Sequence, residues 1–283
     1  MSRARWVTAL ALVVALGGAS ISARALERLA PAAERAGQLL YLPNGKHLRI
    51  VSLGHSSLLA DLIYLWAIQF YSEYNTTDRF RYVRHIFGDV IAELDPHYID
   101  AYWLGAMILT IEARDLEGGL ALLDLGIERN PGNWILPYLA AWECNMASNA
   151  ECATRYFEQA AAVPGAPLVA RRMHASMLAR TGALDDALRL WVGVLEDPDS
   201  DDVSRAIARR KVREVRAEIE RSALRDVIGA FRISNERLPR DLAELVRRGY
   251  IRQVPSDPSG QPYAYDATTG RITSAAGRVL GEP

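Results

Sequence analysis

The sequence predicts a mainly α-helical protein, in which helical hairpins stack into a solenoid between a hydrophobic N-terminal helix and a small α+β C-terminal module. The first observation is an internal period. Four prolines recur at intervals of 35, 33 and 34 residues: Pro96, Pro131, Pro164 and Pro198. The second is that each of the last three prolines ends a similar helical pattern. The third is a change near the C-terminus, where alternating tyrosines and a Thr-Gly turn indicate a β-hairpin.

The composition is that of a folded protein without a strong net charge. The 283 residues are 50% hydrophobic and 24% charged, and the formal net charge is −1. No overall field therefore attracts nucleic acid, so we expect no nucleic-acid partner. The length is sufficient for one extended or two compact domains.

The N-terminus looks like a targeting segment. Arg3 and Arg5 precede an uncharged run over residues 6–23. The small residues Ala23 and Ala25 fit the cleavage site of a secretory signal. The length of the run also fits an uncleaved anchor near the lower limit for a membrane-spanning helix. Both interpretations predict a periplasmic protein, anchored in an inner membrane or released from it; a buried soluble helix is the third alternative.

The next segment divides into a linker and an apolar helix. Residues 26–57 are interpreted as a linker helix and loop, with a break at the Pro-Asn-Gly turn signal. From Leu53 to about residue 75 the chain is apolar almost all round, which is typical of a helix buried on several sides. We interpret it as core rather than as a membrane span, because it is short and contains Asp61.

Each period contains the residue types that two closely packed helices need. Small residues occupy matching positions on the first and second helices: Ala106, Ala141 and Ala175, then Gly119, Ala153 and Ala187. Large apolar residues follow one turn later: Leu123, Phe157 and Trp191. Proline then stops the second helix, which it cannot continue. With this period, residues 95–200 resemble the tetratricopeptide repeat family, which implies a solenoid of paired helices, extended by a degenerate repeat to 58–200.

The chain beyond residue 200 has a different pattern. The acidic stretch 199–202 can cap a long charged helix, assigned to 201–235. A final module over 222–283 is expected to hold the end of this helix, a short helix and a β-hairpin. Residues 222–275 resemble the C-terminal part of type II secretion pseudopilins. The matching residues are Asn235, Arg237, Leu238, Pro239, Asp257, Pro258, Gly260, Tyr263 and Tyr265. The pilin processing pattern is missing from the N-terminal segment, assigned to 1–25.

The sequence shows no pattern of catalytic residues. Cys144 and Cys152 are too few for a disulfide scaffold, and no zinc-binding partners stand near them. They flank a helix–helix turn, so they either form a disulfide or remain two free thiols. No metal-ligand motif, phosphate-binding glycine loop or paired nucleophile and base is found. We therefore expect no enzyme, no cofactor, no metal and no small-molecule substrate.

The tetratricopeptide resemblance implies a binding groove lined by the outward positions of the first helices. Taken from the family's register, these positions are Trp103, Met107, Tyr138, Trp142, Asn145, Arg172, Ser176 and Arg180. Aromatic, Met and Arg side chains are enriched where proteins recognise each other. A peptide could place its apolar side on Trp103 and Trp142 and an acidic group near Arg172 and Arg180. Alternatively, the aromatic residues are covered by the N-terminal helix or by residues 58–70.

The function expected from these patterns is a non-catalytic scaffold that holds a protein or peptide partner in the cell envelope. A secretion or pilus-like assembly follows from the pseudopilin resemblance alone. The alternative is an accessory subunit docked on a membrane protein complex through its hydrophobic N-terminal region, with residues 47–75 as the docking face. An enzyme of unrecognised type would need a pocket with convergent titratable groups.

Overall fold

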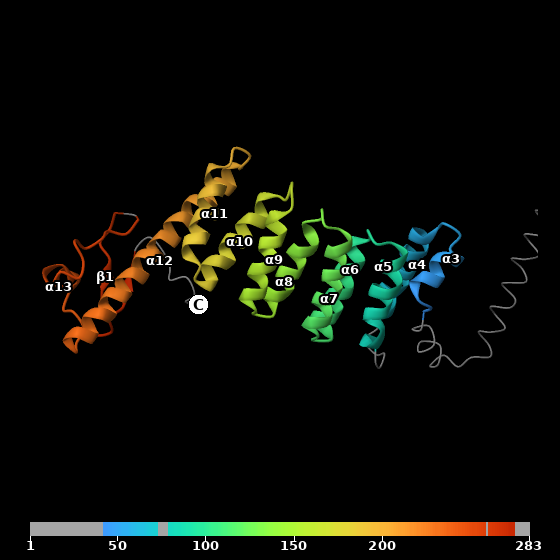
Figure 1. Ribbon diagram of the computed structural model, residues 1–283, viewed down its shortest axis with the longest axis horizontal. Coiled ribbons are helices and arrows are strands. Elements are labelled where there is room, and N and C mark those ends of the chain that lie inside the picture. The colour runs from blue at the N-terminus through green and yellow to red at the C-terminus, as the bar shows by residue number, and fades with distance from the viewer. Residues whose placement is uncertain (1–41, 73–78, 259, 275–283) are drawn as a thin grey trace, which may run out of the picture. The chain divides into compact units, whose positions relative to one another are not determined.

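The computed structural model describes residues 42–72, 79–258 and 260–274, and the prediction of a mainly α-helical protein is confirmed for them (Figure 1). The chain forms two compact units, one ending at Ala101 and the other beginning at Tyr102, which are described separately. The predicted hydrophobic N-terminal helix lies outside the described residues.

The predicted localisation requires a correction. Among the described residues, no helix is long and apolar enough to cross a membrane. The apolar helix α4 (Ser56–Tyr71) has 16 residues. At 1.5 Å per residue it spans about 24 Å, whereas the hydrocarbon layer is about 30 Å thick. The prediction of an inner-membrane-anchored periplasmic domain is therefore contradicted by the described helices, and its original basis, residues 1–25, lies outside them.

The first unit consists of short helices around α4. Its elements are α3 (Gly45–Val51), α4, the 3-10 turn η1 (Arg79–Tyr82), the π-helical segment η2 (His85–Ile91), α5 (Ala92–Leu94) and the start of α6 (Ile99–Met107). The side chain of Asn44 caps α3 by accepting a hydrogen bond from the Lys46 backbone N–H at 2.9 Å. α4 packs against η2 and α5.

Only one face of α4 is buried. Ala60, Ile63, Ala67 and Tyr71 form that face, at the spacing of a helical stripe. On the opposite face lie three leucines, each more than half exposed: Leu58, Leu62 and Leu65. The prediction that this helix is buried on several sides is therefore wrong. The helix is apolar on every side, but only one face packs into the core. The opposite face exposes a stripe of leucines to solvent.

The second unit is a succession of helices in which each packs against the next. After α6 come η3 (Ile108–Glu112), which is π-helical, α7 (Leu116–Arg129), α8 (Ile135–Met146), α9 (Ala150–Ala162), α10 (Leu168–Thr181), α11 (Leu184–Glu196) and α12 (Asp202–Asn235). Side chains of Asp115, Asn149 and Asp201 cap α7, α9 and α12. α10 is capped at its C-terminus by Gly182, whose φ of 87° is readily adopted only by glycine.

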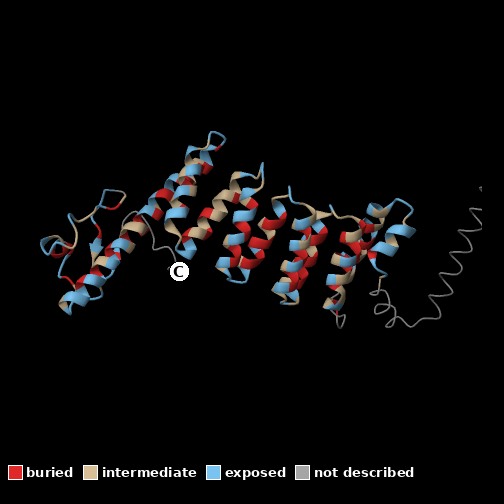
Figure 2. Ribbon diagram, viewed as in Figure 1, coloured by how far each residue is buried: buried red, intermediate tan, exposed pale blue. Residues whose placement is uncertain are grey.

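The small and large residues of the period belong to the buried parts of these helices, which are coloured red in Figure 2. The small alanines and the large Leu123, Phe157 and Trp191 are all buried. Glycine is needed where helices approach most closely. A Cβ atom on Gly119 would lie 2.3 Å from Thr110 Oγ1, and one on Gly126 would lie 2.9 Å from Tyr102 Cγ. The spacing of small residues therefore sets how near neighbouring helices come.

The long helix α12 carries two separate cores. Its first half closes a cluster with α10 and α11, and its second half packs against the C-terminal module. That module contains α13 (Leu242–Arg247) and the antiparallel strands β1 (Ala264–Tyr265) and β2 (Ile272–Thr273), with Tyr265 opposite Ile272. The acidic stretch predicted to cap the helix does so through Asp201, whose carboxylate accepts from the Ser204 backbone N–H at 2.6 Å.

Candidate partner-binding groove

Two helical segments of the second unit present their outer faces to one groove. The groove encloses about 370 Å³ and is lined by Trp103, Met107, Ile111, Tyr138, Leu139, Trp142, Glu143 and Met146. The first three are four residues apart, so they lie on one face of α6 and η3. The other five lie on one face of α8. Trp103 and Trp142 are 42% and 45% exposed, so both indole rings are open to solvent along this groove.

The opposite faces of the same helices explain this orientation. In α6, Tyr102 and Ala106 are buried in the core, which turns the neighbouring Trp103 and Met107 outward. In α8, the core positions are Leu136, Ala140, Ala141 and Cys144. The rings of Tyr138 and Phe157 meet edge to face at 5.3 Å between their centroids. Tyr138, which lines the groove, therefore packs against the buried ring of Phe157 in the core.

Four of the eight predicted groove residues do not line this cavity. Arg180 Nη1 donates a hydrogen bond to Asn145 Oδ1 at 2.6 Å, and Arg172 Nη1 donates to Ser204 Oγ at 3.0 Å. Ser176 Oγ donates to the Arg172 carbonyl oxygen at 2.9 Å. The structure therefore brings Trp103, Met107, Tyr138 and Trp142 together and places the other four along α8 and α10. Both arginines make contacts within the chain, where the sequence suggested a place for an acidic partner group.

Sequence reasoning missed Glu143, which also lines the groove. Glu143 is only 3% exposed, and its Oε2 atom has no hydrogen-bond partner. Burial raises the pKa of this carboxyl group above its usual value. A signal was present, because Glu143 is the single charged residue in the sequence of α8, ILPYLAAWECNM. An isolated acid in an apolar helix is unlike the acids at helix starts, which cap and face solvent.

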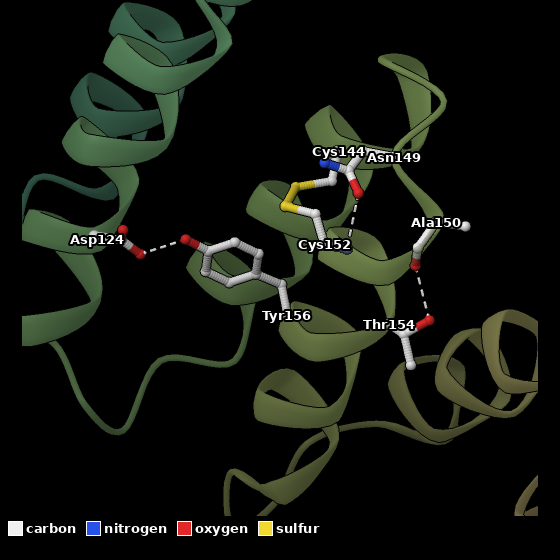
Figure 3. The surroundings of a disulfide bond; sticks show 7 residues. All are labelled: Asp124, Cys144, Asn149, Ala150, Cys152, Thr154 and Tyr156. Carbon is white, nitrogen blue, oxygen red and sulfur yellow. Dashed lines mark hydrogen bonds between the residues drawn. A yellow bond between two sulfur atoms is a disulfide. The ribbon is translucent and has the colours of Figure 1, made fainter. Parts of the chain in front are cut away.

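A disulfide closes the turn between α8 and α9 (Figure 3). Cys144 and Cys152 are joined, with their Cα atoms 5.6 Å apart. Of the two alternatives that the sequence left open, a disulfide or two free thiols, the structure has the disulfide. Asn149, between them, accepts from the Cys152 backbone N–H at 3.1 Å. A link across eight residues removes chain entropy from the unfolded state worth about 2.5 kcal/mol. The bridge therefore holds the end of α8 that carries Glu143 and Met146.

The α9 helix is also linked to α7 by a partly buried polar contact. The Tyr156 hydroxyl donates to Asp124 Oδ1 at 2.7 Å (Figure 3). Burial and this carboxylate raise the pKa of Tyr156 to about 12. The phenol is therefore protonated at neutral pH and acts as a hydrogen-bond donor between the two helices.

Titratable groups converge at a second pocket, of about 420 Å³, between α9, α10 and α11. Glu158, His174 and Asp186 line it, together with Arg189, which forms an ion pair with Asp186. Burial lowers the pKa of His174, and the charges of Glu158 and Asp186 oppose that shift. Its lining contains no Ser, Thr or Cys nucleophile. Across the described residues, no three His, Cys, Asp or Glu side chains are grouped so that they could hold a metal ion.

Comparisons with known proteins assign the chain to no family. No protein-family model matches it, and no curated protein sequence matches it either. The tetratricopeptide and pseudopilin resemblances therefore stay predictions, and the case for a function depends on the groove and on the exposed faces of the helices.

Proposed function

We propose that the protein is a non-catalytic interaction scaffold, built from tetratricopeptide-type helix pairs, that holds a protein or peptide partner in the groove of α6 and α8. The observation that carries this proposal is the exposure of Trp103 and Trp142 in one groove. The period near 34 residues and the succession of packed helices support the repeat assignment. Exposed apolar patches with aromatic residues are typical of interaction sites.

The groove has the composition of a partner-binding surface rather than of a solvated one. Tryptophan is the side chain most enriched among residues whose truncation weakens binding by 2 kcal/mol or more. Methionine adapts to partners of different shape because its chain is flexible and polarizable. Met107 and Met146 occupy the same groove as the two tryptophans. Covering these side chains removes apolar surface from water, which contributes about 25 cal/mol for each Å².

Truncating Trp142 to alanine should remove partner binding and leave the fold intact. We expect crosslinks between the groove and its partner in cells to fall by at least about tenfold, because a hot-spot residue is lost. The free energy of unfolding should change by less than about 1 kcal/mol, since the side chain is 45% exposed. Crosslinking mass spectrometry identifies the partner, and urea unfolding measures the stability.

The control variant is Ile233→Ala, which truncates an exposed apolar side chain on α12, away from the groove. It should retain every crosslink. Unchanged crosslinks in Trp142→Ala would contradict the proposal. A large loss of stability in that variant would show instead that the ring belongs to the core.

The partner is proposed to belong to a secretion or pilus-like assembly. This rests on the pseudopilin resemblance of residues 222–275. The order of elements there, the end of α12, then α13, then the β1–β2 hairpin, is compatible with that resemblance. The groove itself is independent of this assignment.

A second candidate function follows from the leucine stripe on α4, defined as Leu58, Leu62 and Leu65. An accessory subunit docked through this face would bury a helical stripe that the first unit leaves exposed. Replacing Leu62 with glutamate should then abolish co-purification with a larger complex at high salt, because a charge enters an apolar contact. Stability should stay within about 0.5 kcal/mol of the wild type, as for a surface substitution. Retained co-purification would contradict this candidate, and Trp142→Ala serves as its control.

A further inference from the structure

The buried carboxyl group of Glu143 is unlike the other buried acids among the described residues. Glu218 accepts hydrogen bonds from Arg221, and Glu244 forms an ion pair with Arg237. Asp257 accepts from the Gln261 backbone N–H at 2.9 Å. Glu143 is as deeply buried as these residues, yet its Oε2 atom has no hydrogen-bond partner. Each of the other three acids serves a local contact, and this atom of Glu143 serves none.

An unpartnered buried oxygen is costly, and native proteins rarely leave one. Most buried polar side chains without a partner are explained by strain, by a missing water or ion, or by a role in function. Glu143 lies in the lining of a solvent-open groove, beside residues suited to partner contact. The Oε2 atom itself is shielded from solvent, so a donor from a bound partner reaches it once side chains of the groove lining move aside.

We propose that the groove selects a partner segment carrying a lysine or arginine, whose cationic group donates a hydrogen bond to Glu143 Oε2. This inference rests on the proposed function of the groove. Trp103 and Trp142 can attract the same cation through their ring faces. The aliphatic stem of lysine or arginine can cover Met107 and Met146. The recognised element is thus one basic side chain between apolar neighbours.

Other occupants fit the groove less well. An acidic side chain would meet a carboxyl group at the apolar base of the site. A purely apolar segment would remove Glu143 further from water without supplying a donor. A cation stabilises the ionised carboxylate and forms a charge-assisted hydrogen bond, which is stronger than a neutral one. The acidic partner group that the sequence suggested was placed near Arg172 and Arg180, which lie outside this groove.

Short peptides can test the preference with the full-length protein. The probes are leucine-flanked peptides, acetylated and amidated at their ends, with lysine, norleucine, arginine or citrulline in the centre. Each charged residue is thereby paired with a neutral residue of similar shape. Isothermal titration calorimetry should show the lysine and arginine peptides binding at least about tenfold more tightly than their neutral counterparts. Glu143→Gln should reduce the lysine-to-norleucine and arginine-to-citrulline affinity ratios to about one.

The matched control is Glu128→Gln, which removes an exposed carboxylate from α7 and should keep the full preference. Equal binding of lysine and norleucine peptides to the wild-type protein would overturn the cation inference while leaving the groove as a binding site. Binding of none of the four peptides at about 1 mM would count against the groove function as well. The comparison of charged and neutral peptides on the wild-type protein tests the cation preference even if Glu143→Gln does not fold.

Discussion

Replacing Glu218 with alanine should destabilise the protein by about 3–5 kcal/mol, because it leaves a buried guanidinium group without its counter-ion. Arg221 is 1% exposed and Glu218 is 8% exposed. Arg221 donates two hydrogen bonds to Glu218 Oε2, one of them from Nε at 3.1 Å. Arg225 donates to the other carboxylate oxygen at 2.7 Å. Alanine keeps the helix propensity of α12 high, so the loss reports the ion pair.

A neighbouring acid on the same helix provides the control. Glu214 pairs with Lys211 and Arg210, whose side chains are much more exposed than that of Arg221. Glu214→Ala should therefore cost at most about 1 kcal/mol. A double variant, Glu218→Leu with Arg221→Met, should recover most of the lost stability, because an apolar pair has no charge to desolvate. Urea unfolding distinguishes these outcomes, and equal costs for the two single variants would refute the importance of burial.

The helical succession could be predicted because its signals are local and repeated. Proline marks the end of the second helices, and small residues recur where helices approach. Asp201 illustrates the same point for a single helix, because a cap needs only a carboxylate near the first backbone N–H groups. Each of these features is decided by residues within one or two turns, so a sequence alone contains it.

The candidate site was less accessible from sequence because it depends on contacts between helices. The family register selected Trp103 and Trp142, and the structure places both in one groove. It could not show that Arg180 contacts Asn145, which is 35 residues away in the chain. The register also did not select Glu143: the sequence marks it as the single charged residue of α8, but its significance comes from burial without a partner for Oε2.

The exposed stripe on α4 shows a different limit of sequence reasoning. A helix with apolar residues on every side has no polar face to indicate which side meets solvent. Periodicity therefore could not separate the buried face of Ala60 and Ala67 from the exposed face of Leu62. Whether each face of such a helix lies in the core or on the surface depends on which other elements of the fold pack against it. The sequence of the helix itself does not contain that information.

Replacing Trp191 with alanine should cost about 3–5 kcal/mol, as for other buried aromatic residues truncated in a core. Trp191 is 2% exposed and lies in the cluster that joins α10, α11 and the first half of α12. Its neighbours include Ala175 and Ala187, which are too small to fill the space that the indole ring leaves. The cavity would therefore remain largely open, and the three helices would lose their common contact.

Trp191→Phe separates the two properties of this side chain. The indole Nε1 has no hydrogen-bond partner, so its N–H is a buried donor that contributes nothing to offset its desolvation. Phenylalanine removes that donor and fills most of the space, so we expect a loss of no more than about half that of alanine. Because each helix packs mainly on its neighbours, amide hydrogen exchange in the alanine variant should accelerate most in α10 to α12. Uniform acceleration through α7 to α12 would mean instead that the succession unfolds as one cooperative unit.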